Sequence, residues 1–257
     1  MTTTVGLSTP APTLRFEVRR VPMWRALRWL SDGWGDLRQI GSAGLAHGAL
    51  IAVLGGILLM LGSSHMYLTA AAVTGYLLLG PIMTTGLCEL ARRREAHLSS
   101  GFDESLQALT RNPAGLVHFG GILALIALLW FALSAALLGS ANIASTPTLA
   151  VALWGGSALV SNSQVLAYIA CGAVLAVIVF AVSVVAVPLI IDRHASASDA
   201  IRASMRVTFS NLPTMLVWAL LIVALTAVGF LTLLLGMVVV APLLGYATWH
   251  AYRDLIA

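Results

Sequence analysis

The stretch GFDESLQALTRNPAGLVHFGGILAL, residues 101–125, decides the fold of this chain. Its first half places Phe102, Leu106 and Leu109 at i, i+4 and i+7, the spacing of an amphipathic helix. An Asn-Pro pair ending at Pro113 then breaks that helix, because proline suits the first turn of a helix but not its interior. The apolar residues that follow predict a membrane helix, so the stretch joins a surface helix to a span.

Composition places the whole chain in a membrane. Of its 257 residues, 59% are hydrophobic and only 9% are charged, whereas soluble domains carry about 25% charged residues. All 14 basic residues are arginine, and in so apolar a chain they are expected to hold a cytoplasmic membrane face rather than a nucleic acid. Cys88 and Cys171 lie in apolar runs without metal-ligand or disulfide spacing, so packing roles are expected for both.

The hydropathy pattern predicts an all-α, polytopic protein. Six transmembrane helices are expected at residues 45–61, 67–87, 114–138, 165–191, 213–230 and 233–252. Residues 1–17 lack the features of a signal peptide and are predicted to form a disordered tail. A single membrane domain is expected over residues 18–257, with an uncharged loop over 139–163.

The charges predict the orientation. Six arginines precede the first predicted span, four lie between the second and third, three between the fourth and fifth, and one follows the sixth. All ten acidic residues lie on that same side, and the opposite loops carry no charge. This positive-inside pattern predicts that both termini are cytoplasmic.

Before the first span, residues 15–38 predict another amphipathic helix. Its apolar face is expected to hold Met23, Ala26, Leu27, Leu30, Trp34 and Leu37, and its polar face Arg25, Arg28, Asp32 and Asp36. Such a helix either lies in the membrane interface or packs on the cytoplasmic face of the protein, and the pattern fits both.

The same arrangement recurs three times. The i, i+4, i+7 spacing is repeated by Leu30, Trp34 and Leu37 and by Ile201, Met205 and Thr208. Three parallel units are predicted at about residues 22–94, 95–194 and 195–257, each a cytoplasmic amphipathic helix followed by a helical hairpin. Structural hinges are predicted at Pro81, Pro113, Pro188, Pro213 and Pro242. Those inside the spans either shape packing or line a central cavity. In the third unit, Ser198 or Asp199 is the expected N-cap.

Candidate chemistry is sparse. His47 and His118 occupy matching repeat positions near the cytoplasmic ends of two spans, where a histidine pair could bind haem or a metal axially. The third unit has Trp218 there, and packing explains single histidines equally well. No predicted span holds a deep charged residue, which argues against an ion-coupled transporter. No catalytic motif occurs, so no catalytic residue, no metal and no cofactor is expected.

Two segments resemble a known family. They are VRRVPMWRALRWLSDGWGDLRQIGSAGLAHG, with its core Gly33, Trp34, Asp36 and Leu37, and RRREAHLSSGFDESLQAL. Together with the six-span plan they resemble the bacterial integral-membrane family known as domain of unknown function 2189, from about residue 18 to the C-terminus. Gly41 stands where such proteins are expected to have proline. The resemblance implies a bacterial inner-membrane location and brings no activity or catalytic residue.

The function expected from these features is non-enzymatic. The leading hypothesis is an accessory or assembly component of a larger membrane complex, with membrane lipids and a protein as partners. The alternative is a permease or lipid-handling protein with a pathway along the proline-kinked helices. A haem- or quinone-binding redox subunit that uses His47 and His118 is a weaker alternative.

Overall fold

The computed structural model describes residues 16–62, 66–138 and 162–257. Their regular structure is helical: α1 (Arg25–Ile40), α2 (Ser42–Gly62), α3 (Met66–Leu78), α4 (Gly80–Met83), α5 (Thr85–Glu95), α6 (Phe102–Leu106), α7 (Ala108–Arg111), α8 (Pro113–Leu138), α10 (Asn162–Ser183), α11 (Ala186–Asp192), α12 (Ala197–Ser210), α13 (Leu212–Leu231) and α14 (Met237–Leu255). One isolated β-bridge joins Val18 to Ile256. The all-α prediction is confirmed for these residues, whereas the predicted outer loop and most of the predicted tail lie outside them.

Four helices in the described residues are long and apolar enough to cross a membrane: α2, α8, α10 with α11, and α13. The predicted span at 67–87 is divided into α3, α4 and α5, with interruptions at Leu79 and Thr84. Pro81 lies in the first turn of α4, where its missing N–H is tolerated. The sixth predicted span corresponds to α14, whose last turns carry charged residues. The chain is therefore a multi-pass membrane protein with four candidate spans in the part described.

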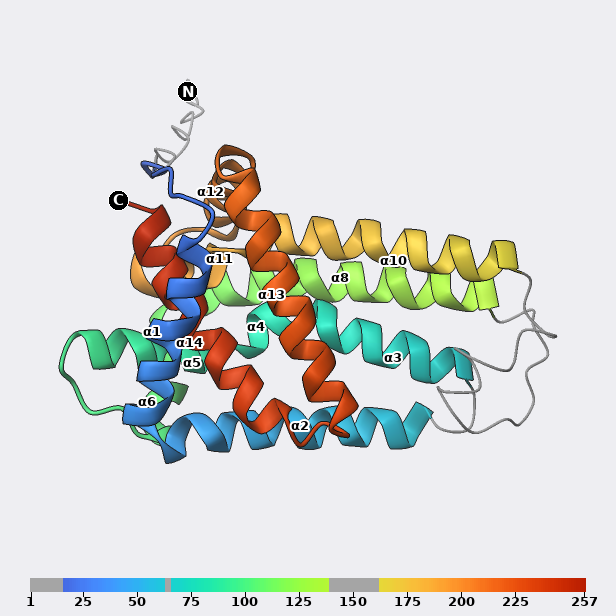
Figure 1. Ribbon diagram of the computed structural model, residues 1–257, viewed down its shortest axis with the longest axis horizontal. Helices are drawn as coiled ribbons and strands as arrows, with labels where there is room; N and C mark the ends of the chain where they lie inside the picture. The colour runs from blue at the N-terminus through green and yellow to red at the C-terminus, as the bar shows by residue number, and fades with distance from the viewer. Residues whose placement is uncertain (1–15, 63–65, 139–161) are drawn as a thin grey trace, which may run out of the picture.

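Figure 1 shows α2, α3, α8 and α10 running side by side along the long axis of the molecule, with α1 lying across one end. We call this end the base; it comprises α1, α5, α6, α7, α11, α12 and the C-terminal turns of α14. Both ends of the described chain lie there, and α14 contacts α1, α2 and α5. The base is therefore where segments far apart in the sequence meet.

Glycines allow α14 to approach its neighbours closely. A methyl group at Gly33 of α1 would lie 2.8 Å from the backbone nitrogen of Ala247, and one at Gly245 would lie 2.7 Å from Cβ of Leu87 in α5. Small residues at such crossings let helix backbones touch in a membrane protein, where packing drives helix association.

The α13–α14 hairpin is tilted relative to the four parallel helices (Figure 1). The side chain of Leu234 in its turn lies against Gly55, partway along α2. Leu233 and Leu234 adopt left-handed backbone conformations, with φ of 53° and 67°. Their backbone N–H groups bind the carbonyls of Phe230 and Gly229. The turn thus satisfies these donors internally, as a lipid environment requires.

Helix α1 has two apolar faces. Ala26, Trp29 and Leu37 are buried, and the Trp29 ring meets that of Trp218 edge-on at 5.8 Å between centroids. Met23, Trp24, Leu27 and Trp34 are exposed instead. The predicted single apolar face is therefore wrong in part, because the helix packs on the protein and also presents apolar side chains outward.

The N-cap of α12 lies two residues before the nearer of its two predicted positions. Ser196 is the N-cap, and its hydroxyl accepts a hydrogen bond from the backbone nitrogen of Asp199 at 3.1 Å. The prediction of Ser198 or Asp199 as N-cap was therefore wrong, because Ser196 supplies the capping oxygen.

Candidate functional site

The base contains a buried carboxylate, Glu89 of α5, whose side chain is fully shielded from solvent. Its oxygens accept hydrogen bonds from Arg92 at 2.7 and 2.8 Å. Arg93 and Arg111 approach it to 3.9 and 3.7 Å. Arg111 also donates to the carbonyl of Ile191 at 2.7 Å. Glu89 therefore joins α5, α7 and α11 through a buried ionic cluster.

A second carboxylate, Asp36 of α1, is also buried. It accepts hydrogen bonds from Arg94 and, at 3.0 Å, from Nε2 of His250. Arg94 donates in addition to Gln39 at 2.6 and 3.0 Å. Asp36 was predicted on the polar face of α1 with Arg25, Arg28 and Asp32. The sequence did not indicate its burial, because α5 and α14 supply partners that local periodicity does not reveal.

The C-terminal turns of α14 complete the network. Both oxygens of Asp254 accept from Arg25, at 2.5 and 2.9 Å, and one accepts from the indole of Trp29 at 2.7 Å. Burial alone would raise the pKa of Asp254, but the hydrogen bonds from Arg25 and Trp29 outweigh it and leave that pKa below its ordinary value. The Tyr252 hydroxyl likewise donates to Asp192 at 2.6 Å.

Both ends of the described chain are fastened at the base. The backbone nitrogen of Arg19 donates to Leu255 at 2.9 Å, and that of Ala257 donates to Glu17 at 3.1 Å. The Asn211 side chain accepts from the backbone nitrogen of Val21 at 2.9 Å and donates to the carbonyl of Arg19 at 3.1 Å. The segment before α1 is therefore held against α14 and the start of α13.

Asn112 has a corresponding role one unit earlier. Its Oδ1 accepts from the backbone nitrogen of Gly115 at 3.0 Å, which caps α8. Its Nδ2 donates to the carbonyl of Ala195 at 2.9 Å and to that of Ile190 at 3.3 Å. Two asparagines that each precede a predicted hinge proline thus bind the backbone of another segment at the base.

The structure places the two candidate histidines differently. His47 is buried: its Nδ1 lies 3.1 Å from the carbonyl of Ala43, and its Nε2 lies 3.1 Å from the Ser105 hydroxyl. Its ring packs on that of Phe102 at 4.7 Å. His118 is exposed on α8, and no contact between the two histidines is recorded in the described residues. Axial haem ligation by this pair stays a prediction.

The predicted hinge prolines occupy unequal positions. Pro81, Pro113 and Pro213 lie in the first turns of α4, α8 and α13. Pro188 lies within α11, after the chain is interrupted near Val185, and Pro242 lies inside the continuous helix α14. Pro188 is close to the end of α11 at the base, whereas Pro81 lies much farther from the end of α5. The prolines inside the predicted spans therefore lie at different depths. Pro81 and Pro188 follow interruptions of the helix, whereas Pro242 lies in a helix that continues through it.

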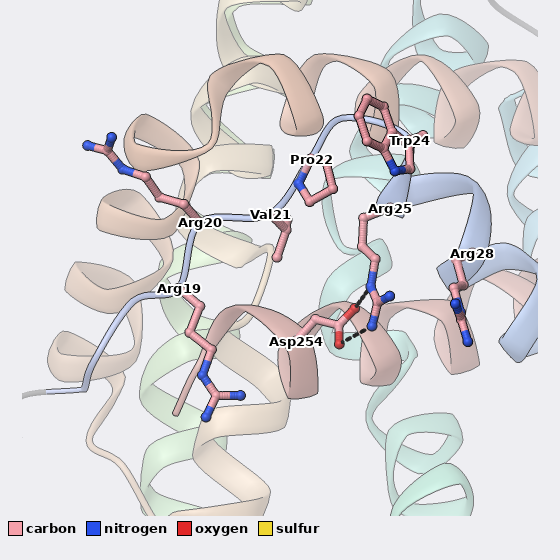
Figure 2. A pocket seen from close by; sticks show the side chains of 8 residues that line it. All are labelled: Arg19, Arg20, Val21, Pro22, Trp24, Arg25, Arg28 and Asp254. Atoms are coloured by element: carbon pink, nitrogen blue, oxygen red, sulfur yellow. Dashed lines mark hydrogen bonds and ion pairs between the residues drawn. The ribbon is translucent and has the colours of Figure 1, made fainter.

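A cavity of about 350 Å³ opens where the N-terminal segment enters α1. Its walls are Arg19, Arg20, Val21, Pro22, Trp24, Arg25, Arg28 and Asp254. Figure 2 shows the Arg25 fork against Asp254, flanked by Arg19 and Arg28, with Arg20 extending away from them. The carboxylate is committed to Arg25 and Trp29, so the walls carry a net positive charge. Such a site can bind an anion.

The carboxylates of the base bind cationic side chains from other helices. The described residues contain no group of three or more His, Cys, Asp or Glu side chains that could hold a metal ion. Glu89, Asp36 and Asp254 each have cationic partners that fix them in place. The network joins helices, and the arginine-lined cavity is the part of it that a ligand can reach.

Comparison with known proteins identifies the central part of the chain. A family model described as "Predicted integral membrane protein (DUF2189)" matches residues 68–192. This confirms the family resemblance. The match runs from within α3 to the end of α11 and leaves out α1, α13, α14 and the cavity. No curated protein and no solved structure matches the chain.

Sequence reasoning missed the cavity and the buried carboxylates. The available signal for Glu89 was its i, i+3 and i+4 spacing to Arg92 and Arg93 on one helix. The signal for the cavity was the spacing of Arg25 and Arg28, which places two cations on one side of α1. Neither signal indicated that Asp254, from the other end of the chain, would join them.

Proposed function

We propose that this protein is a non-enzymatic accessory or assembly component of a larger complex in the bacterial inner membrane. The observation that supports this best is a set of exposed apolar side chains at matching positions of the three predicted units. Trp34, Leu106 and Met205 hold the same i+4 position in the three repeated patterns, and their exposed fractions are 43%, 48% and 40%. Outside the spans, such side chains favour contact with a partner or the membrane interface.

The ionic network supports a scaffold. Glu89 and Asp36 are buried among arginines from different helices, and both ends of the described chain are fastened to α14 or α13. Breaking such buried pairs is costly, so the base keeps one shape. A fixed surface suits the positioning of a partner subunit.

The proposal extends to topology. Three hairpins, α2 with α3–α5, α8 with α10–α11 and α13 with α14, would supply six membrane helices in three parallel units. Each hairpin begins and ends at the base (Figure 1), which agrees with arginines confined to one side. The paired roles of Asn112 and Asn211 support the repeat. The positive-inside rule then places the base and both termini in the cytoplasm.

Purification of the full-length protein in mild detergent, followed by mass spectrometry, tests the accessory role. A partner should be retained in a fixed ratio by the wild type and by the triple variant L125A/L166A/L220A, whose altered residues are exposed on spans. It should be lost from the triple variant W34A/L106A/M205A. Purification of a monomer without a stoichiometric partner would overturn the proposal. If the protein reconstituted in liposomes carries solute across the membrane, the permease alternative is favoured. A Soret band would instead support the redox alternative.

A further inference from the structure

The arginine-lined cavity holds cations without acidic partners. Among the described residues, the side chains of Arg19, Arg20 and Arg28 form no ion pair or hydrogen bond. Arg25 is bound through two nitrogens to Asp254, which is the one carboxylate in the cavity wall. Guanidinium groups present several donors in one plane, which match the oxygens of a phosphate group.

The cavity lies at the N-terminus of α1, a helix of 16 residues. The first turn of α1 contains no acidic residue, and its N-cap, Trp24, makes no side-chain capping bond. The backbone N–H groups of Arg25 and Leu27 bind the carbonyls of Pro22 and Trp24, so the helix contributes the positive end of its dipole to the arginine charges rather than free N–H donors.

The depth of the cavity is fixed by the start of a membrane helix. Asn211 holds the backbone of Arg19 and Val21, and the Thr214 hydroxyl donates to the carbonyl of Val21 at 2.9 Å. Leu212 begins the candidate span Leu212–Leu231. The cavity wall therefore lies at the end of a span, at the level of lipid headgroups rather than in bulk water.

Apolar side chains flank the same opening. Trp24 lines the cavity and is 66% exposed, and Met23 and Leu27 beside it on the same stretch are 52% and 56% exposed. Tryptophan is enriched at the headgroup level of membranes, and exposed apolar residues on an interfacial helix contact acyl chains. A ligand with both a phosphate and an acyl chain matches this combination better than a free anion.

We propose that the cavity formed by Arg19, Arg25, Arg28 and the N-terminus of α1 binds the phosphate of an anionic phospholipid headgroup. Its volume of about 350 Å³ is within the range of about 300–1,000 Å³ typical of small-molecule sites. Arg25 holds the wall in place through Asp254, and Arg19 and Arg28 supply the free guanidinium groups. The lipid belongs to the leaflet on the side of the base.

The test uses the purified full-length protein in a neutral detergent. Short-chain phosphatidylglycerol, phosphatidylcholine with the same chains, and inorganic phosphate are titrated separately, and the shift of the thermal unfolding midpoint gives each apparent Kd. The double variant R19Q/R28Q is compared with R38Q/R206Q, which removes two other exposed arginines whose side chains form no ion pair or hydrogen bond within the described chain. The single variant R28Q serves if the first double variant fails to fold.

Phosphatidylglycerol should bind the wild type and R38Q/R206Q alike. Its apparent affinity should fall about tenfold to thirtyfold in R19Q/R28Q, and about fivefold in R28Q. Equal binding of inorganic phosphate would overturn the lipid assignment in favour of a free anion. If both double variants lose the same affinity for phosphatidylglycerol, the binding reflects general charge attraction and the proposed site is wrong. The proposal also fails if phosphatidylcholine binds as tightly as phosphatidylglycerol, or if phosphatidylglycerol does not bind.

Discussion

Glu89 shows how one residue holds the base together. Replacing it with glutamine leaves Arg92, Arg93 and Arg111 without their shared anion in a shielded place. The variant E89Q should lose roughly 3 kcal/mol of unfolding free energy, since breaking a buried ion pair leaves uncompensated charge. Chemical unfolding in detergent, followed by tryptophan fluorescence, measures this loss.

The matched control is D103N, which removes a carboxylate that is exposed and has no recorded ion pair in the described chain. Its stability should equal that of the wild type, because an exposed carboxylate contributes little. Equal stabilities of E89Q and the wild type would show that the Glu89 cluster is dispensable.

Because of Asp254, we expect the unfolding free energy to fall at acid pH. Its pKa in the folded protein lies below the ordinary value of 3.8, so the carboxylate stabilises the fold above that value. The contribution is lost as the pH falls through the lowered pKa. Between pH 7 and pH 3 the wild type should therefore lose more unfolding free energy than D254N, which has no carboxylate to protonate. Unfolding curves across this range provide the comparison, and parallel pH profiles would contradict the expectation.

Residue-level burial was the least predictable feature. Periodicity placed Asp36 on the polar face of α1 but did not indicate that this position is buried. The partners Arg94 and His250 come from α5 and α14, far away in the sequence. Ala26 and Leu37 were correctly predicted on the apolar face of α1, and both are buried.

At the scale of elements, Asn112 joins two helical units. The substitution N112A removes the cap of α8 and the bonds to Ala195 and Ile190. It should destabilise the protein by about 2 kcal/mol, of which the cap accounts for about half. Thermal unfolding of N112D separates the two roles, because aspartate keeps the capping oxygen but cannot donate. N112D should therefore fall between the wild type and N112A.

Asn211 should behave differently because its bonds hold the N-terminal segment. In N211A, Arg19 and Val21 lose their side-chain partner, so trypsin should cleave after Arg19 or Arg20 several times faster than in the wild type. Cleavage after Arg206, on α12, is the internal reference. An unchanged ratio of the two cleavage rates would show that the bonds to Thr214, Leu255 and Ala257 fasten the segment without Asn211.

The sequence predicted where helices occur more reliably than whether a helix runs without interruption. The apolar runs that became α2, α8 and α13 were predicted within a few residues, because length and hydropathy decide them. The run at 67–87 also reads as one span. Its division at Leu79 and Thr84 depends on Pro81 and on packing against α8 and α14, which hydropathy does not report.

For the whole molecule, charge distribution gave the clearest prediction. Every charged residue was expected on one side, and the ionic network, the cavity and both ends of the described chain do gather at the base (Figure 1). The pairing of the N-terminal segment with residues 255–257 could not be predicted, because it depends on how the third hairpin returns.

The turn of the third hairpin, α13–α14, lies partway along α2 rather than at its far end. Leu234 lies against Gly55, and α2 advances about 20 Å from Ser42 to Gly55 at about 1.5 Å per residue. The turn therefore ends about 10 Å short of the far end of α2. Leu231, Leu233 and Leu235 are 83%, 86% and 75% exposed in this turn. Exposed leucines at that depth belong in hydrocarbon.

The variant L233R tests this placement. An arginine in the hydrocarbon layer costs about 2.5–3.5 kcal/mol, so membrane-integrated protein should fall sharply and the remainder should be less stable in liposomes. The control L98R places the same charge on an exposed loop of the base and should integrate normally. If L233R integrates as well as L98R, the turn reaches the opposite headgroups and α13 and α14 cross the membrane completely. A selective defect in L233R places the turn inside the bilayer, with α13 and α14 as an embedded hairpin that braces α2.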